Sequence, residues 1–149
     1  MVSQDQSEKI LGELSTSELT GVGLRRYAME LLSALPTYNW SGIYRLEKDE
    51  LLLDEYVGAS TDHTRIPVGR GVCGTAVAEN QNQVIEDVRE LTNYLSCSTQ
   101  TRSEIVVLIK RDDVILGQID IDGHTVGAFD RSDENLLSEI GSILATHWS

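Results

Sequence analysis

Two short apolar runs separated by three charged residues limit what this chain can fold into, because that pattern is typical of a β-hairpin. The runs cover residues 104–110 and 114–121, and the charged segment 111–113 lies between them. Hairpin strands pair antiparallel. The sequence therefore predicts an antiparallel sheet that contains this hairpin.

The rest of the chain alternates between helical and strand-like patterns. Asp130 is the expected N-cap of the last helix. Residues 1–16 are polar with weak apolar spacing and form either a frayed lead-in or a short helix. The other expected elements are helices at 24–35, 73–79 and 136–148, strands at 40–46, 51–57 and 83–85, and loops at 58–72 and 87–103. This order predicts an α+β fold with one antiparallel sheet, in a single domain over 1–149.

The net charge of the chain limits which binding partners are expected. The 149 residues carry a formal net charge of −12, which disfavours nucleic acid and anionic membrane surfaces as partners. No apolar run approaches the roughly 20 residues that span a bilayer. The first ten residues resemble neither a signal peptide nor a transit peptide, so we expect a cytoplasmic protein.

The chain has two cysteines, Cys73 and Cys97. In a reducing cytosol they are expected to be free, catalytic or redox-sensing thiols. Cys97 has polar neighbours and is either an accessible nucleophile or an ordinary, partly buried cysteine. Cys73 follows two glycines that open a short helix, whose N-terminus would lower the pKa of the thiol. The residues alone favour a small core residue at position 73.

Three carboxylates lie in the apolar runs of the hairpin. Alternation along a strand places Asp120 and Asp122 on one face. If the turn has three residues, Glu104 lies opposite Asp120 on that face. Like charges in such positions destabilise a sheet. The acids are therefore expected to receive an ammonium group or to share a proton, unless they form only an exposed acidic strand end.

Trp40 and Tyr44 are four positions apart and share a strand face. They form either the apolar wall of a pocket or an ordinary core pair. The chain shows no zinc-type ligand spacing, no Walker loop and no GxGxxG pattern. We therefore expect neither a metal nor a cofactor.

Several segments together resemble the free methionine-(R)-sulfoxide reductases, which are built on a single GAF domain. The resemblance implies a GAF-like central antiparallel sheet, with the N- and C-terminal helices on one face and a loop-covered pocket on the other. The segments that carry it are NWSGIYRLE at 39–47, RIPVGRGVCGTAVA at 65–78, QVIEDV at 83–88, the stretch 97–107, GQIDID at 117–122 and FDRSDE at 129–134.

The resemblance also implies a reaction. Free L-methionine-(R)-sulfoxide would be reduced to methionine through a cysteine sulfenic acid and a disulfide, with thioredoxin or another thiol as reductant. Cys97, seven residues before Glu104, matches the cysteine that attacks the sulfoxide sulfur. Trp40, Tyr44 and the three acids would contact the substrate. A homodimer is one candidate assembly.

The chain departs from this family at three positions. Members commonly carry a further cysteine ten positions before Cys73, where this chain has His63. Either Cys73 or an external thiol would then resolve the sulfenic acid. Ser98 stands where the family usually has Asp, and Leu108 where it often has Pro. The missing cysteine favours an alternative function, a non-catalytic GAF module that senses a small ligand, although no output domain accompanies it.

Overall fold

The computed structural model describes residues 1–92, 94 and 99–149. In this part of the chain one antiparallel sheet has the strand order β3-β2-β1-β6-β5-β4, which confirms the predicted α+β class. The helices are α1 (Gln4–Thr16), α2 (Gly21–Ser33), α3 (Gly71–Glu79), the 3₁₀ helix η1 (Val88–Glu90) and α4 (Arg131–Thr146). The strands are β1 (Trp40–Glu47), β2 (Glu50–Val57), β3 (Arg65–Pro67), β4 (Gln83–Ile85), β5 (Ser103–Arg111) and β6 (Val114–Gly123).

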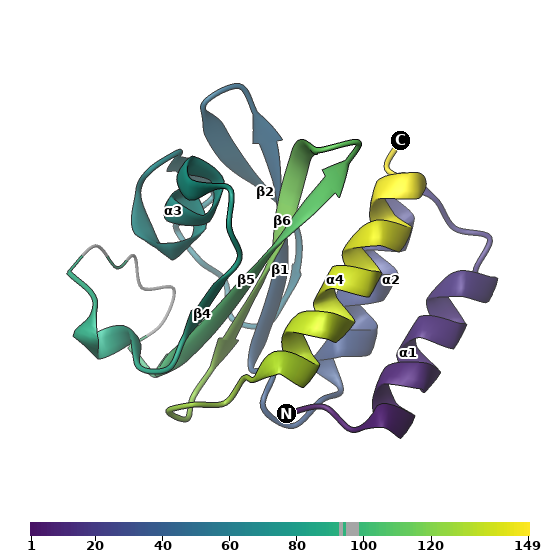
Figure 1. The fold of residues 1–149 in the computed structure, drawn as a ribbon, viewed down its shortest axis with the longest axis horizontal. Helices are drawn as coiled ribbons and strands as arrows, with labels where there is room; N and C mark the ends of the chain where they lie inside the picture. The colour runs from purple at the N-terminus through teal and green to yellow at the C-terminus, as the bar shows by residue number, and fades with distance from the viewer. Residues whose placement is uncertain (93, 95–98) are drawn as a thin grey trace.

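The helices divide between the two faces of the sheet. α2 and α4 pack on one face, and α1 lies outside them against both (Figure 1). α3 covers part of the other face. Each face has its own apolar cluster, because alternate side chains of the strands point to opposite sides. The expected placement of the first and last helices on one face is confirmed.

Residues 1–16 form a helix, which was one of the two structures expected there. Ser3 caps α1 in a reciprocal capping box with Gln6. Ile10 and Leu14 are buried. These two apolar side chains, one helical turn apart, pack this short polar helix against the helix layer.

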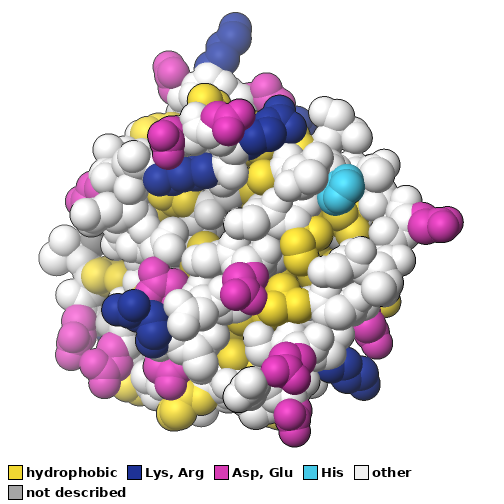
Figure 2. Space-filling view, turned by 45° about the vertical axis from the view of Figure 1, so that its right-hand side comes forward, with side chains coloured by type: hydrophobic (Ala, Val, Ile, Leu, Met, Phe, Trp, Pro, Cys, Tyr) yellow, Lys and Arg dark blue, Asp and Glu magenta, His cyan; other side chains and the backbone are white. Residues whose placement is uncertain are grey.

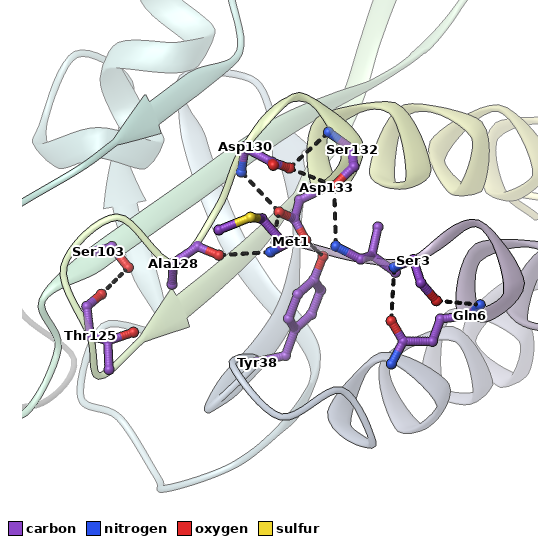
Figure 3. Close-up of polar contacts among 11 residues, drawn as sticks. Met1, Ser3, Gln6, Tyr38, Ser103, Thr125, Ala128, Asp130, Ser132 and Asp133 are labelled. Carbon is purple, nitrogen blue, oxygen red and sulfur yellow. Dashed lines mark hydrogen bonds and ion pairs between the residues drawn. The ribbon is translucent and has the colours of Figure 1, made fainter.

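The start of α4 joins distant parts of the chain (Figure 3). Asp130 caps the helix as predicted, in a capping box with Asp133. The Tyr38 hydroxyl donates to Asp133 Oδ1 at 2.6 Å, and the Met1 amine lies 2.8 Å from Asp133 Oδ2. The Met1 amine also donates to the Ala128 carbonyl at 2.9 Å. Asp133 is fully buried, so these contacts compensate the burial of its charge.

The turn of the β5–β6 hairpin differs from the expected one. It has two residues rather than three, Asp112 and Asp113, with φ of 52° and 67°. Two left-handed residues in succession are typical of the type I′ turn, which matches the twist of a hairpin. A register shift between Ile109 and Lys110 then changes which residues of β5 and β6 pair beyond that point.

This geometry changes which acids face each other. Glu104 lies opposite Asp122, and not opposite Asp120 as the three-residue turn implied. All three acids nevertheless keep the same face, because residues two apart on a strand stay on one side.

Two other elements lie in segments expected to be loops. β3 lies within 58–72 and pairs with β2 at the edge of the sheet, where Pro67 is tolerated. η1 lies within 87–103. Each has three residues, too few to show a period in the sequence. α3 begins at Gly71, two residues earlier than expected.

Among the described residues no helix combines the length and the apolar character that crossing a membrane requires. Figure 2 shows acidic side chains spread over one face of the molecule, as expected for a net charge of −12.

Candidate functional site

Five predicted site residues share the face of the sheet opposite α2 and α4. β1 carries Trp40 and Tyr44, β5 carries Glu104, and β6 carries Asp120 and Asp122. The pairing of Trp40 and Glu104 with Asp122 brings the three central strands into register there. The prediction that the acids lie on one face with the two aromatic residues is confirmed.

α3 places Cys73 against the acids. The Cys73 Sγ lies 4.0 Å from Glu104 Oε2. Gly74 allows α3 to pack closely against the end of β3, because a Cβ at that position would lie 2.6 Å from the Pro67 carbonyl oxygen. The glycine-containing segment therefore serves to bring a thiol against the sheet.

Two cavities open beside the acids. The smaller one measures about 10 Å³, room for a single water molecule or ion. Its lining is Tyr44, His63, Ile66, Arg70, Gly71, Val72, Cys73, Glu104 and Asp120. The larger one measures about 240 Å³ and is lined by Asn39, Trp40, Ala59, Gln100, Thr101, Asp122 and His124. Asp120 thus faces the small cavity and Asp122 the large one.

Hydrogen bonds to the backbone orient both aromatic residues. Trp40 Nε1 donates to the Ala59 carbonyl at 2.9 Å, and the Trp40 ring stacks on Tyr56 with centroids 5.5 Å apart. The Tyr44 hydroxyl donates to the His63 carbonyl at 2.8 Å. Trp40 therefore forms a fixed wall of the larger cavity and Tyr44 of the smaller one.

Burial dominates the electrostatics of the acids. It raises the pKa of Asp120, and it raises the pKa of Asp122 well above the ordinary value, with the charge of Asp120 as the second cause. The Oδ1 atoms of both residues have no hydrogen-bond partner within the described ranges. Two buried carboxyl oxygens are therefore available to an ammonium group, a proton donor or a metal ion.

The pKa of the Cys73 thiol corrects the expectation from sequence. Burial raises it well above its ordinary value, and the nearby charges of Asp120 and Glu104 raise it further. The N-terminus of α3 was expected to lower it. The thiol is only 5% exposed and lies among acids that are distant in the sequence. Burial and these negative charges both raise its pKa and so oppose the lowering by the helix dipole.

Cys97 and Ser98 lie outside the described residues, so the expected approach of Cys97 to Cys73 stays a prediction. Sequence reasoning also missed several residues that line the cavities, among them Thr101 and Arg70. Thr101 lines the larger cavity with a buried hydroxyl, and Arg70 lines the smaller one. Arg70 belongs to the glycine-containing segment that the sequence singled out, whereas Thr101 carries no sequence signal.

The comparisons with known proteins agree with this geometry. Residues 24–148 match the family model described as GAF domain. Over 120 residues the chain is 42% identical to a free methionine-R-sulfoxide reductase of Escherichia coli, covering 78% of this chain and 72% of that protein.

Two solved structures are similar over nearly the whole chain. The free methionine-R-sulfoxide reductase of Neisseria meningitidis, solved in complex with its substrate, has a TM-score of 0.87 and 29% identity, covering 99% of this chain and 92% of that one. The reduced form of fRMsr from Staphylococcus aureus has a TM-score of 0.86 and 31% identity and covers both chains fully, at 100% each. The chain therefore belongs to the GAF domain family and is related to the free methionine-R-sulfoxide reductases.

Proposed function

We propose that this protein reduces free L-methionine-(R)-sulfoxide to methionine with the electrons of its thiols. One observation carries the proposal: a thiol and three buried carboxyl groups gather on one sheet face, in a chain related to reductases of this substrate. Buried acids of like charge disfavour stability, so a catalytic role accounts for them better than a structural one.

In the proposed first step the Cys97 thiolate attacks the sulfoxide sulfur. A protonated carboxyl group of the site gives its proton to the sulfoxide oxygen. The raised pKa of Asp120 supports this role, because it keeps a proton available at higher pH than an exposed carboxyl would. Oxygen passes in net terms from the substrate to Cys97, leaving methionine and a cysteine sulfenic acid.

In the second step Cys73 attacks the sulfenic sulfur, which forms a disulfide and releases water. A dithiol such as thioredoxin then restores both thiols. Cys73 takes this part because His63 stands where related reductases commonly carry a cysteine. The buried, protonated state of Cys73 predicts that this step is slow until the site rearranges.

The free amino acid would bind across the two cavities. Asp122, with an unpartnered oxygen beside the larger cavity, would receive the ammonium group, and the Trp40 ring would line the apolar part. The sulfoxide end would lie toward Glu104 and Asp120. A reductase of N. meningitidis with the same fold was solved in complex with its substrate, which supports a substrate site within this fold.

The test is turnover. The reduced protein is incubated with racemic free methionine sulfoxide and dithiothreitol, and chiral chromatography follows each epimer and methionine. We expect loss of the R epimer alone and an equal gain of methionine. Asp122→Asn should reduce the rate strongly, whereas Asp112→Asn, an exposed acid in the turn of the same hairpin, should not.

A protein that binds the sulfoxide but forms no methionine would instead be a ligand-sensing GAF module. The replacement of a family cysteine by His63 is the observation that favours this alternative. Equal consumption of both epimers would contradict the stereochemistry proposed for the site.

A further inference from the structure

We propose that Cys73, Glu104 and Asp120 form a binding site for a single Zn²⁺ ion. One ligand atom of each residue lies within 4.8 Å of the other two, and all three side chains are buried. Among the described residues this is the only cluster of at least three such side chains with that spacing. The binding site itself does not depend on the proposed enzymatic activity.

An independent observation points to a ligand at this place. Asp120 is 1% exposed and lines the small cavity, and its Oδ1 has no hydrogen-bond partner in the part of the chain that the structure describes. A buried carboxyl oxygen without a partner costs free energy. The cavity of about 10 Å³ admits one ion and excludes an organic molecule.

The ligand types select the metal. A thiolate with two carboxylates suits Zn²⁺, which takes four ligands at about 2.3 Å from sulfur and about 2.0–2.2 Å from oxygen. Those bond lengths separate tetrahedral sulfur and oxygen ligands by about 3.5 Å. The present distance of 4.0 Å from Cys73 Sγ to Glu104 Oε2 requires a small inward movement. Mg²⁺ and Ca²⁺ need more oxygen ligands and do not favour sulfur.

Charge balance supports the same site. Three acidic side chains, Cys73, Glu104 and Asp120, lie together in this buried cluster. A divalent ion would neutralise negative charges that otherwise repel each other in this buried place. The other titratable groups at this cavity are Tyr44, His63 and Arg70, and Asp122 adds a negative charge from β6.

The ion would also regulate the enzyme, an inference that does rest on the proposed function. Coordination would hold Cys73 as a thiolate bound to metal and would occupy Glu104 and Asp120. The resolving thiol and the proton donor would then be lost together. Zn²⁺ would act as a reversible inhibitor that a chelator removes.

Binding is measured without turnover. The full chain, reduced and treated with chelator, is titrated with Zn²⁺ against a chromophoric zinc indicator. We expect one ion per chain. Cys73→Ser and Asp120→Asn should each weaken binding by more than about tenfold, since even supporting residues of a metal site cost about 10–100-fold. Asp112→Asn is the matched control and should bind as the unaltered protein does.

Cobalt identifies the sulfur ligand. With Co²⁺ we expect a thiolate-to-metal charge-transfer absorption that Cys73→Ser abolishes and Cys97→Ser retains. The opposite pattern would place the metal on Cys97 and overturn the proposal. So would undiminished zinc binding by Asp120→Asn, which tests the site even if Cys73→Ser does not fold. Methionine formation by the metal-free protein is assayed separately, so loss of the zinc site and absence of reductase activity are distinguished.

Discussion

Glu104 and Asp122 lie directly opposite each other on neighbouring strands, with exposures of only 4% and 2%. Two negative charges in that position repel, and burial adds a cost to each. Burial, and after it the charge of Asp120, raises the pKa of Asp122 well above its ordinary value, so Asp122 keeps its proton to higher pH than an exposed carboxyl would.

Asp122→Asn should stabilise the protein near neutral pH while it lowers activity. Burial raises the folded-state pKa of Asp122 above its ordinary value of 3.8. The folded state therefore binds the proton more tightly, and stability falls as pH rises from about 3.8 through the raised pKa. Asparagine avoids this loss. We expect a gain on the order of 1 kcal/mol in the free energy of unfolding at neutral pH.

Urea unfolding at several pH values measures this effect. The gain should shrink as pH falls and should vanish below the ordinary pKa of 3.8. Asp112→Asn, in the exposed turn, should change stability little at any pH. A loss of stability in Asp122→Asn at neutral pH would show that the carboxylate is needed for the fold.

Gly117→Ala should destabilise the junction of β1 and β6. A Cβ at this position would lie 2.2 Å from the Tyr44 carbonyl oxygen, so the strands would have to separate. We expect a cost of about 3 kcal/mol, as for overpacked interiors. Thermal unfolding measures it. Gly12→Ala is the control, because Gly12 lies at an exposed position of α1 with no atom within 4 Å of an added Cβ, and alanine favours a helix over glycine by about 0.5–1 kcal/mol.

The shared face of the acids could be predicted from sequence because strand alternation survives an error in register. Asp120 and Asp122 point to one side whatever they pair with. The partner of Glu104 could not be predicted, since it depends on the turn and on the bulge after Ile109. Both Asp112 and Asp113 tolerate the left-handed conformation. The sequence alone does not show whether the turn has two residues or three.

The burial of Cys73 was expected from its residues, whereas the acids around its thiol could not be predicted. Its neighbours in sequence are small and polar, and a helix start would lower the pKa of its thiol. The chain packs α3 against the sheet and surrounds the thiol with acids from β5 and β6. A property set by residues far apart in sequence becomes visible only when the sheet is assembled.

Tyr38→Phe should weaken the attachment of α4. The hydroxyl donates to the buried Asp133 at 2.6 Å across 95 positions of sequence. Its loss leaves Asp133 with one partner fewer, at a cost of about 1–3 kcal/mol. Tyr27→Phe is the matched control, because its bond to Glu13 is longer, at 3.2 Å, and only partly buried. Equal effects of the two substitutions on the unfolding midpoint would contradict this assignment.

A single turnover should distinguish the roles of the two thiols. Cys97→Ser should form no methionine, because a serine hydroxyl stays protonated near neutral pH and is a poor nucleophile toward sulfur. Cys73→Ser should form one methionine per chain and stop, with Cys97 left as a sulfenic acid. The assay uses excess substrate without reductant, so each chain can turn over only once, and a dimedone-type reagent traps the sulfenic acid for mass spectrometry.

The steady state then tests how Cys97 is recycled. With thioredoxin, Cys73→Ser should fail to turn over, whereas a small dithiol should restore turnover by attacking Cys97 directly. Full activity of Cys73→Ser with thioredoxin would assign the resolving role to the external thiol. Loss of the first turnover in Cys73→Ser, with methionine still formed by Cys97→Ser, would reverse the roles. That result would make the buried thiol beside Glu104 and Asp120 the nucleophile, although its raised pKa opposes thiolate formation.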